Sequence, residues 1–391
     1  MEPSKLSRLL LVCSKWPPEY GGPGIYYQRI MPFLRSLSDQ VHVVTKRGAL
    51  PPASGLGTPA LTFSTLRRPR TGVGHYLFGS RVAARVVWHV LTSRGRCGVI
   101  FAGGNTMSGW RETATVLNWF GVPVVVENVL LTSDDGDSIL ALPFRGFTRF
   151  AVRRLRSFCP VSTGLLRSVE RSFPEAMCAL LPYGIDLDAN APPTIAAKTN
   201  AREELGLPAS AFVAITLGAV HERKGQLPLI EAWLEWIRGS SETNARLLVV
   251  GPRATPAYSL QLDRLLAEAG PERDTVVFTG QTDDSAKYLR AADIYVTASY
   301  AEGLPISIVE ALAHGLPVAC RWLEGVTDDF MHGRAVTPIA PWSAEGFAAA
   351  MRALRDDRIF VEASRDARAV AEQRFDVRRR VETLGKLLIV Q

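Results

Sequence analysis

The feature that most restricts the fold of this chain is a repeated alternation of short apolar runs and helical stretches. The chain opens with RLLLVCS at residues 8–14, a run typical of a central parallel strand that is covered on both faces. Further strands are expected at residues 41–45, 99–101 and 122–126, with helices at 25–37 and 113–120. This order predicts βαβ units and a doubly wound parallel sheet.

The alternation begins again after residue 200. Strands are expected at residues 211–217, 245–250, 275–278, 294–298 and 318–319. Helices are expected at residues 226–237 and 285–292, around Glu310, and at 343–354 and 358–388. Residues 189–200, with two prolines and many small residues, are typical of a linker, and residues 47–75 of an irregular, mobile insertion.

A chain of 391 residues is too long for one typical core. We therefore predict an α/β protein of two Rossmann-like domains, residues 1–188 and 189–370, which face each other across a central cleft. Residues 371–391 are expected to form a helix that packs back toward the first domain. Neither domain opens its first helix with G-x-G-x-x-G, which argues against a dehydrogenase.

Composition favours a soluble globular enzyme, because 47% of the residues are hydrophobic and 21% are charged. No apolar run reaches the roughly 20 residues that a membrane-spanning helix needs, and no secretory signal is evident at the N-terminus. The five cysteines are scattered and never spaced as C-x-x-C, which argues against a disulfide framework and a zinc site. A cytoplasmic location is expected.

Charge is distributed unevenly along the chain. Residues 1–185 contain 22 Lys and Arg against 10 Asp and Glu, whereas the remainder contains 23 against 28. The basic half predicts an anionic partner, a membrane surface or an acidic acceptor rather than nucleic acid. A basic face that serves only solubility is the alternative.

The segment EGLPISIVE, residues 302–310, suggests the chemistry. Backbone N–H groups at the start of a helix attract phosphate, and carboxylates on either side can accept hydrogen bonds from sugar hydroxyls. Glu302 and Glu310 flank such a start, so this segment could hold the diphosphate and sugars of a nucleotide-sugar. The alternative is an ordinary helix with one surface and one capping glutamate.

Five segments, in order, resemble the retaining glycosyltransferases of family 4. They are GGPG, LPYGID, LGAVHERKG, VVFTGQT and AADIYVTASYAEGLPISIVEALAHGLPVA. The resemblance implies the GT-B fold and transfer of a sugar from a nucleotide-sugar to an acceptor hydroxyl with retention of configuration, in glycan, polysaccharide or glycolipid synthesis. It implies a lipid-linked or saccharide acceptor, no covalent protein nucleophile and no cofactor.

The resemblance also assigns roles to residues of the second domain. Lys224 is expected to contact the diphosphate, where a fixed cation stabilises the charge that develops on the leaving group. The family usually has an arginine directly after the glycine of this loop, but Ala219 follows Gly218 here, so Arg223 is the candidate substitute. A pair of solvated loop residues is the alternative.

Glu302 matches the family carboxylate that contacts the donor sugar, and Glu310 the one that binds the ribose. The backbone of the turn between them is expected to lie along the diphosphate. Two further residues are expected near the base, Gly280 and Gln281. The donor-binding candidates of the second domain besides the two glutamates are therefore Gly303, Leu304, Pro305, Ile306, Gly280 and Gln281.

In the first domain, Gly21, Gly22 and Gly24 are expected to form a flexible loop at the carboxyl end of a strand, close to phosphate or acceptor. A plain tight turn is the alternative. The histidine that many family members place after the strand at 122–126 is missing. Asp134 or Asp135 is expected to replace it, with Glu127 as a weaker candidate.

Asp135 and Asp137 also imitate a D-x-D metal motif, but the Lys and Arg side chains already balance the diphosphate charge, so no metal is expected. A capped, solvated loop is the alternative for these acids.

A basic and aromatic helix is expected within RGFTRFAVRRLRSF. Its arginines would lie on one face and could rest on an anionic membrane; they are Arg145, Arg149, Arg153 and Arg156. Two other functions stay open: a nucleotide-sugar epimerase, and a non-catalytic binding protein with a degraded site.

Overall fold

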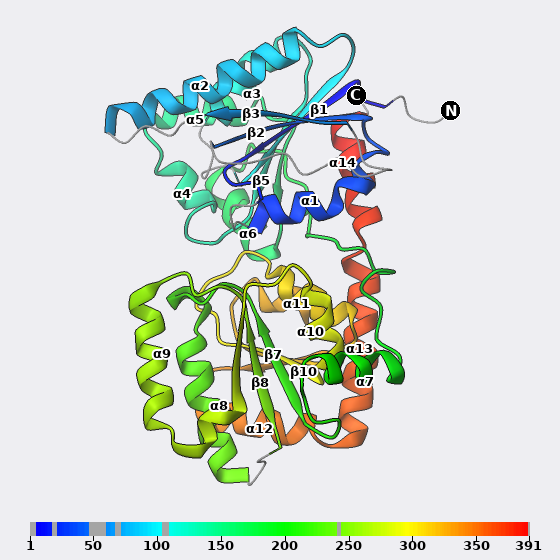
Figure 1. The fold of residues 1–391 in the computed structure, drawn as a ribbon. Helices are drawn as coiled ribbons and strands as arrows, with labels where there is room; N and C mark the ends of the chain where they lie inside the picture. Colours follow the sequence, from blue (N-terminus) through cyan, green and yellow to red (C-terminus); the bar gives the residue numbers. More distant parts are fainter. Residues whose placement is uncertain are drawn as a thin grey trace. The chain divides into compact units, whose positions relative to one another are not determined.

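The computed structural model describes residues 5–17, 22–46, 60–66, 72–103, 109–240 and 244–389. The chain divides into two compact units. The first contains Met1–Gly184 and Val377–Gln391, and the second contains Ile185–Asp376. Each unit has one six-stranded parallel sheet with helices around it (Figure 1). The predicted α/β class with two Rossmann-like domains is confirmed.

The sheet of the first unit has the strand order β3-β2-β1-β4-β5-β6. Its strands are β1 (Arg8–Cys13), β2 (Gln40–Lys46), β3 (Ala60–Leu66), β4 (Cys97–Ala102), β5 (Val124–Asn128) and β6 (Ser157–Pro160). Its helices are α1 (Gly22–Leu34), α2 (Gly72–Leu91), α3 (Trp110–Asn118), α4 (Gly136–Leu140), α5 (Arg145–Val152), α6 (Thr163–Ser172) and α14 (Val377–Leu388).

Apolar side chains on both faces of this sheet explain why β1 and β4 are continuous hydrophobic runs. One core combines these strands with side chains of α2, α3, α5 and α6, among them Val86, Leu117 and Val169. Helix α14, from the end of the chain, packs against α1 and β5.

The sheet of the second unit has the order β12-β11-β10-β7-β8-β9. Its strands are β7 (Val213–Leu217), β8 (Arg246–Val250), β9 (Val276–Gly280), β10 (Ile294–Thr297), β11 (Val318–Arg321) and β12 (Val336–Ile339). Its helices are α7 (Ile195–Glu204), α8 (Gln226–Ser240), α9 (Pro256–Glu268), α10 (Ser285–Ala291), α11 (Ile306–Ala313), α12 (Ala344–Leu354) and α13 (Asp357–Arg374), with 3₁₀ turns η1 (Glu222–Lys224), η2 (Gly270–Thr275) and η3 (Thr327–Phe330).

Several local predictions were wrong. The expected insertion at 47–75 contains strand β3 and the start of α2, although residues 47–59 and 67–71 lie outside the described part. The expected linker at 189–200 contains the start of α7, because Thr194 caps this helix by accepting a hydrogen bond from the Ala197 amide. The helix expected at 358–388 is two helices, α13 and α14, since the chain leaves helical geometry at Phe375.

In the described ranges, no helix combines the length and the hydrophobicity required to cross a bilayer.

Candidate functional site

The loops after β7 and β10 meet at the carboxyl edge of the second sheet. These two strands are neighbours and run parallel, so the segments that follow them leave the sheet on the same side. Turn η1, which carries Arg223 and Lys224, follows β7, and the loop with Glu302 follows β10. Open parallel sheets bind ligands at this edge.

Glu302 binds both cations. Its Oε1 lies 2.7 Å from Lys224 Nζ, and its Oε2 lies 2.9 Å from Nη1 of Arg223. The same Nη1 donates to the Ala301 carbonyl at 2.6 Å. Burial raises the pKa of the Glu302 carboxyl, but the attraction of Lys224 and Arg223 outweighs burial and holds this pKa below its ordinary value. The carboxylate is therefore ionised and fixed at neutral pH.

A glycine allows the two loops to approach this closely. Gly225 has φ of 66°, in the left-handed region, and a Cβ atom there would overlap the carbonyl oxygen of Ala298 just after β10. The Tyr300 amide donates to the Arg223 carbonyl at 2.8 Å. Backbone contacts thus position the cations before any ligand binds.

Helix α11 begins beside Glu302. Pro305 is its N-cap residue, and its carbonyl accepts from the amides of Ile308 and Val309 at 3.0 and 3.3 Å. The amides at the first positions of a helix have no acceptor within it, so those of Ile306 and Ser307 are available in principle to an anion. Glu310, one turn further, is buried.

The remaining candidates of the second unit lie further along the same edge. Gly280 is the last residue of β9, has φ of 74° and accepts from the Gly251 amide at 2.9 Å. Gln281 follows it and is exposed. Strand β8 separates β9 from β7, so this pair lies two strands from the cations of η1.

The glycine loop of the first unit differs from its prediction. Gly21 lies outside the described residues, whereas Gly22 and Gly24 belong to the first turn of α1. A Cβ atom at Gly24 would overlap the Lys15 carbonyl oxygen, so this glycine permits close packing of α1 on the segment after β1. Gly22 and Gly24 are helical, and the expected flexible loop is wrong at these positions.

The acids after β5 have local structural roles. Asp135 caps α4: its Oδ1 accepts from the Ser138 amide at 2.8 Å and its Oδ2 from the Thr132 amide at 2.6 Å. Burial raises the pKa of Asp135, but these hydrogen bonds outweigh burial and lower it. Asp137 accepts from the Ser172 hydroxyl at 2.9 Å and pairs with Arg171 at 3.0 Å. Asp134 is buried.

These contacts fit the capped loop that was the alternative for the acids. Within the described segments, no group of three or more His, Cys, Asp or Glu residues is arranged to hold a metal ion.

Sequence reasoning missed the buried cluster around Glu127. The Tyr27 hydroxyl donates to Glu127 Oε1 at 2.5 Å, and Arg380 of α14 pairs with the same oxygen. Arg380 also donates to the Pro182 carbonyl at 2.9 Å and lies over the Tyr26 ring. Glu127 is fully buried in these contacts and holds elements of the first unit together. Glu127, the weaker candidate for a polar role toward the donor sugar, is therefore engaged in structural contacts.

The predicted basic helix is shorter than expected. Helix α5 ends at Val152, where Arg153 is the C-cap residue, because Arg153 and Arg154 form a turn that leads into β6. Arg156 therefore lies outside the helix, and its Nε donates to the Leu387 carbonyl at 3.1 Å. Arg149 pairs with Glu175 at 3.1 Å. The common helical face of four arginines is wrong, although Arg145 and Arg153 are exposed.

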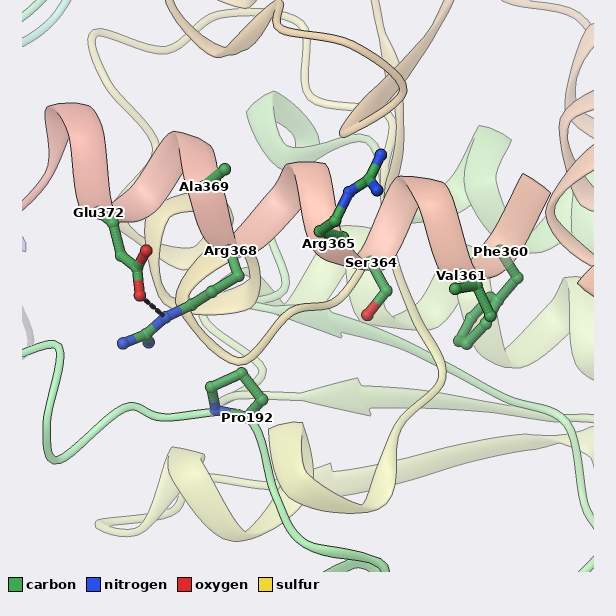
Figure 2. A pocket seen from close by; sticks show the side chains of 8 residues that line it. All are labelled: Pro192, Phe360, Val361, Ser364, Arg365, Arg368, Ala369 and Glu372. Atoms are coloured by element: carbon green, nitrogen blue, oxygen red, sulfur yellow. Dashed lines mark hydrogen bonds and ion pairs between the residues drawn. The ribbon is translucent and has the colours of Figure 1, made fainter. Parts of the chain in front are cut away.

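A hollow of the second unit lies along α13 and not at this edge. Figure 2 shows that residues of α13 line it together with Pro192, and that Arg368 and Glu372 form an ion pair of 2.7 Å there. Arg368 also donates to the Ala313 carbonyl at 2.8 Å, which ties α13 to the end of α11. A separate small pocket is lined by Glu302, Pro305 and Arg321, among others.

Comparison with known proteins supports one family. The family model for glycosyl transferases group 1 matches residues 211–357. D-inositol 3-phosphate glycosyltransferase 2 of Catenulispora acidiphila is 27% identical in an alignment of 368 residues that covers 86% of this chain and 82% of that protein. The lipopolysaccharide core biosynthesis glycosyltransferase LpsD of Rhizobium meliloti is 33% identical over 157 residues, 40% of this chain and 43% of that protein.

Solved structures have the same fold. Anabaena HepE in complex with UDP has a TM-score of 0.75 and 18% identity, covering 98% of this chain and 99% of that one. WaaG, a glycosyltransferase involved in lipopolysaccharide biosynthesis, has a TM-score of 0.69 and 19% identity, covering 98% and 100%. Residues 211–357 are therefore similar to the group 1 glycosyltransferases, and the two Rossmann-like units have the GT-B fold.

Proposed function

We propose that this glycosyltransferase moves a sugar from a nucleotide-sugar to an acceptor hydroxyl with retention of anomeric configuration. The observation that carries the proposal is the contact of Glu302 with both Lys224 and Arg223 beside the start of α11. The proposal is supported because two fixed cations, helix amides and a carboxylate lie at one edge of a parallel sheet.

The proposed reaction breaks the bond between the anomeric carbon and a phosphate oxygen. The electron pair leaves with the diphosphate, the acceptor oxygen bonds to the same face of the sugar, and its proton passes to the leaving phosphate. Lys224 and Arg223 stabilise the charge that develops on the diphosphate. Glu302, held by both, orients the sugar hydroxyls.

The other donor contacts follow the same order. Amides of the 303–306 turn, Leu304 and Ile306 in particular, approach the diphosphate, since Pro305 has no N–H to donate. Glu310 binds the ribose, and Gly280 with Gln281 lies near the base. Asp135, whose oxygens already cap α4, is not part of this proposal.

The proposed reaction needs no metal ion, because two cations of η1 already face the diphosphate. Treatment with a chelator is expected to leave the rate unchanged. The proposed acceptor is a lipid-linked or saccharide hydroxyl, in keeping with the names of relatives, which mention lipopolysaccharide core biosynthesis and D-inositol 3-phosphate. UDP-sugars are the first donors to test, because HepE structures contain UDP and UDP-glucose.

The test begins with a thermal-shift screen of nucleoside diphosphates and their sugars, since a ligand that binds the native state raises the melting temperature. Nucleoside diphosphate release is then measured with and without acceptor, and NMR of the product reads the anomeric configuration. Release that depends on acceptor supports transfer. Conversion of the donor sugar without release would indicate an epimerase.

Variants separate an enzyme from a binding protein. Lys224→Met is expected to lower kcat about 100-fold, because loss of one group that stabilises a developing anion typically has an effect of this size. Lys287→Met is the matched control, since Lys287 pairs with Glu204 at 2.9 Å outside the candidate site. Equal activity of the two variants would refute the role of Lys224. If the wild-type protein binds donor but shows no turnover, it is a non-catalytic binding protein.

We further propose that the first unit rests on the cytoplasmic face of an anionic membrane. Helices α2, α3 and α5 cover one face of its sheet, and large apolar side chains on or next to them face solvent. Trp119 is 80% exposed, Phe144 74% and Trp88 62%. Exposed aromatic residues with nearby arginines, such as Arg145 and Arg153, suit the interface of an anionic bilayer.

Sedimentation with vesicles tests this surface. Wild-type protein is expected to bind phosphatidylglycerol vesicles and not phosphatidylcholine vesicles. Trp119→Ser with Phe144→Ser, and separately Arg145→Glu with Arg153→Glu, should weaken binding while donor hydrolysis is unchanged. Arg273→Glu, an exposed arginine of the second unit, is the control. If both double variants bound vesicles as the wild type does, the membrane proposal would be wrong, and the basic surface would serve only solubility.

A further inference from the structure

Arg321 is a third cation at the carboxyl edge of the second sheet. It is the last residue of β11, and its guanidinium carbon lies 4.4 Å from the centre of the Tyr300 ring and 5.4 Å from that of Trp342. Its Nε donates to the Ala298 carbonyl at 3.0 Å. The hydrogen bond to Ala298 uses one of the five N–H groups of the guanidinium.

No carboxylate pairs with Arg321 in the part of the chain that the structure describes. Arg223 and Lys224 differ, since Glu302 already balances part of their charge. Because contacts with aromatic rings do not use its N–H groups, the other donors of the Arg321 guanidinium can bind a planar anion. Arg321 is thus oriented without being neutralised.

The sheet order locates this cation relative to the proposed donor. Along the edge, β9 ends with the residues proposed for the base, and the cations proposed for the diphosphate follow β7. Glu302, proposed for the sugar, follows β10 together with the 303–306 turn, proposed for the diphosphate. Strand β11 is the next in this order, about 5 Å beyond β10. Arg321 and Glu302 also line the same small pocket. Arg321 therefore lies at the same pocket as the carboxylate proposed for the sugar, on a strand one place further than β10 from the cations that follow β7.

We propose that Arg321, which lies over the rings of Tyr300 and Trp342, binds a carboxylate or phosphate carried by the transferred sugar or by the acceptor next to it. This inference rests on the proposed function, because it uses the order of donor groups along the edge. It adds a preference for a substrate that carries a second anion besides the diphosphate.

The experiment measures a preference ratio. After the screen has identified the base, kcat/KM is compared for the hexose and the hexuronate donor of that nucleotide, with one neutral acceptor. In a second arm, the hexose donor is used with glucose and with glucose 6-phosphate as acceptors. The first arm detects a carboxylate on the sugar and the second a phosphate on the acceptor.

Wild-type protein is expected to prefer the anionic substrate in one arm. Arg321→Gln should lower that ratio about 10- to 100-fold, as expected for the loss of charged hydrogen bonds. Arg321→Lys, which keeps the charge but not the planar fork, should restore part of it. Arg355→Gln is the control, because Arg355 stacks on Phe212 at 4.9 Å outside this edge, and it should keep the wild-type ratio.

The outcomes separate the two proposals. A wild-type enzyme with turnover but no preference for the anion in either arm overturns the role of Arg321. So does an Arg321→Gln variant that loses activity equally on neutral and anionic substrates, because that pattern reports a structural role. Wild-type protein without turnover on any nucleotide-sugar overturns the proposed function and this inference with it.

Discussion

Replacing Arg380 with methionine should destabilise the first unit strongly. Only 2% of its side chain is exposed, and its partner Glu127 is fully buried. The substitution keeps much of the apolar volume but removes the cation and its hydrogen bond to the Pro182 carbonyl. Removing one member of a buried ion pair typically costs about 3–5 kcal/mol, since the other charge stays buried without compensation. We expect a loss of this size.

The loss should depend on pH. Burial raises the pKa of Glu127, while Arg380 and the Tyr27 hydroxyl lower it, so removing Arg380 raises it further. A carboxyl whose pKa is higher in the folded state than in the unfolded state binds more protons when folded. The stability of the variant therefore falls as pH rises above the unfolded pKa of Glu127. The variant should be more stable at pH 5 than at pH 8, relative to wild type.

Urea unfolding, monitored by hydrogen exchange of peptides from β5 and α1, measures the free energy of unfolding of the first unit. Tryptophan fluorescence would combine the signals of both units. Arg149→Met is the matched control, because Arg149 pairs with Glu175 at the surface of the same unit and should cost less than about 1 kcal/mol. Glu127→Gln combined with Arg380→Met should recover part of the loss. If Arg380→Met cost no more than Arg149→Met, the buried pair would not hold the unit together.

Two further predictions concern backbone and pH. Gly225→Ala should lower the free energy of unfolding in a urea titration by at least about 2 kcal/mol, because the alanine is strained in the left-handed region and its Cβ overlaps the Ala298 carbonyl. Gly239→Ala is the control; it lies in open space on α8 and should leave the free energy of unfolding unchanged or raise it. Burial and the neighbouring His89 lower the pKa of His42 to about 4. The unfolded chain therefore binds more protons than the folded one, and the stability of the first unit should fall by up to about 3 kcal/mol as pH drops from 6.5 to 4. His42→Asn should flatten this pH dependence, and an unchanged pH dependence would contradict the lowered pKa of His42.

The sequence predicted the sheets well because parallel strands buried on both faces are continuous apolar runs. The strand expected at 294–298 is β10, at Ile294–Thr297, and the helix expected at 226–237 is α8, at Gln226–Ser240. Strand β3 was missed, since ALTFSTL has polar and exposed residues of an edge strand and lies within a segment rich in proline and glycine. Its weak pattern could not be separated from a loop.

The site was predicted unevenly for a related reason. Lys224 and Glu302, assigned to one site from motifs 78 residues apart, do contact each other. The buried pair of Glu127 and Arg380 was missed because a lone arginine in a charged helix is normally a surface residue, and only the packing of α14 on β5 buries it. Gly24 was read as a flexible loop residue, whereas the Lys15 carbonyl requires its lack of a side chain.

The contacts of Arg321 with Tyr300 and Trp342 could not be predicted from the sequence. Tyr300 follows β10, Arg321 ends β11 and Trp342 follows β12, and each residue alone is indistinguishable from a solvated loop residue. These strands are consecutive in the sheet order β12-β11-β10, and parallel strands release their following loops at one edge. The contact of this cation with both rings is thus a direct result of strand order. Strand order depends on contacts distant in sequence, which local periodicity does not record.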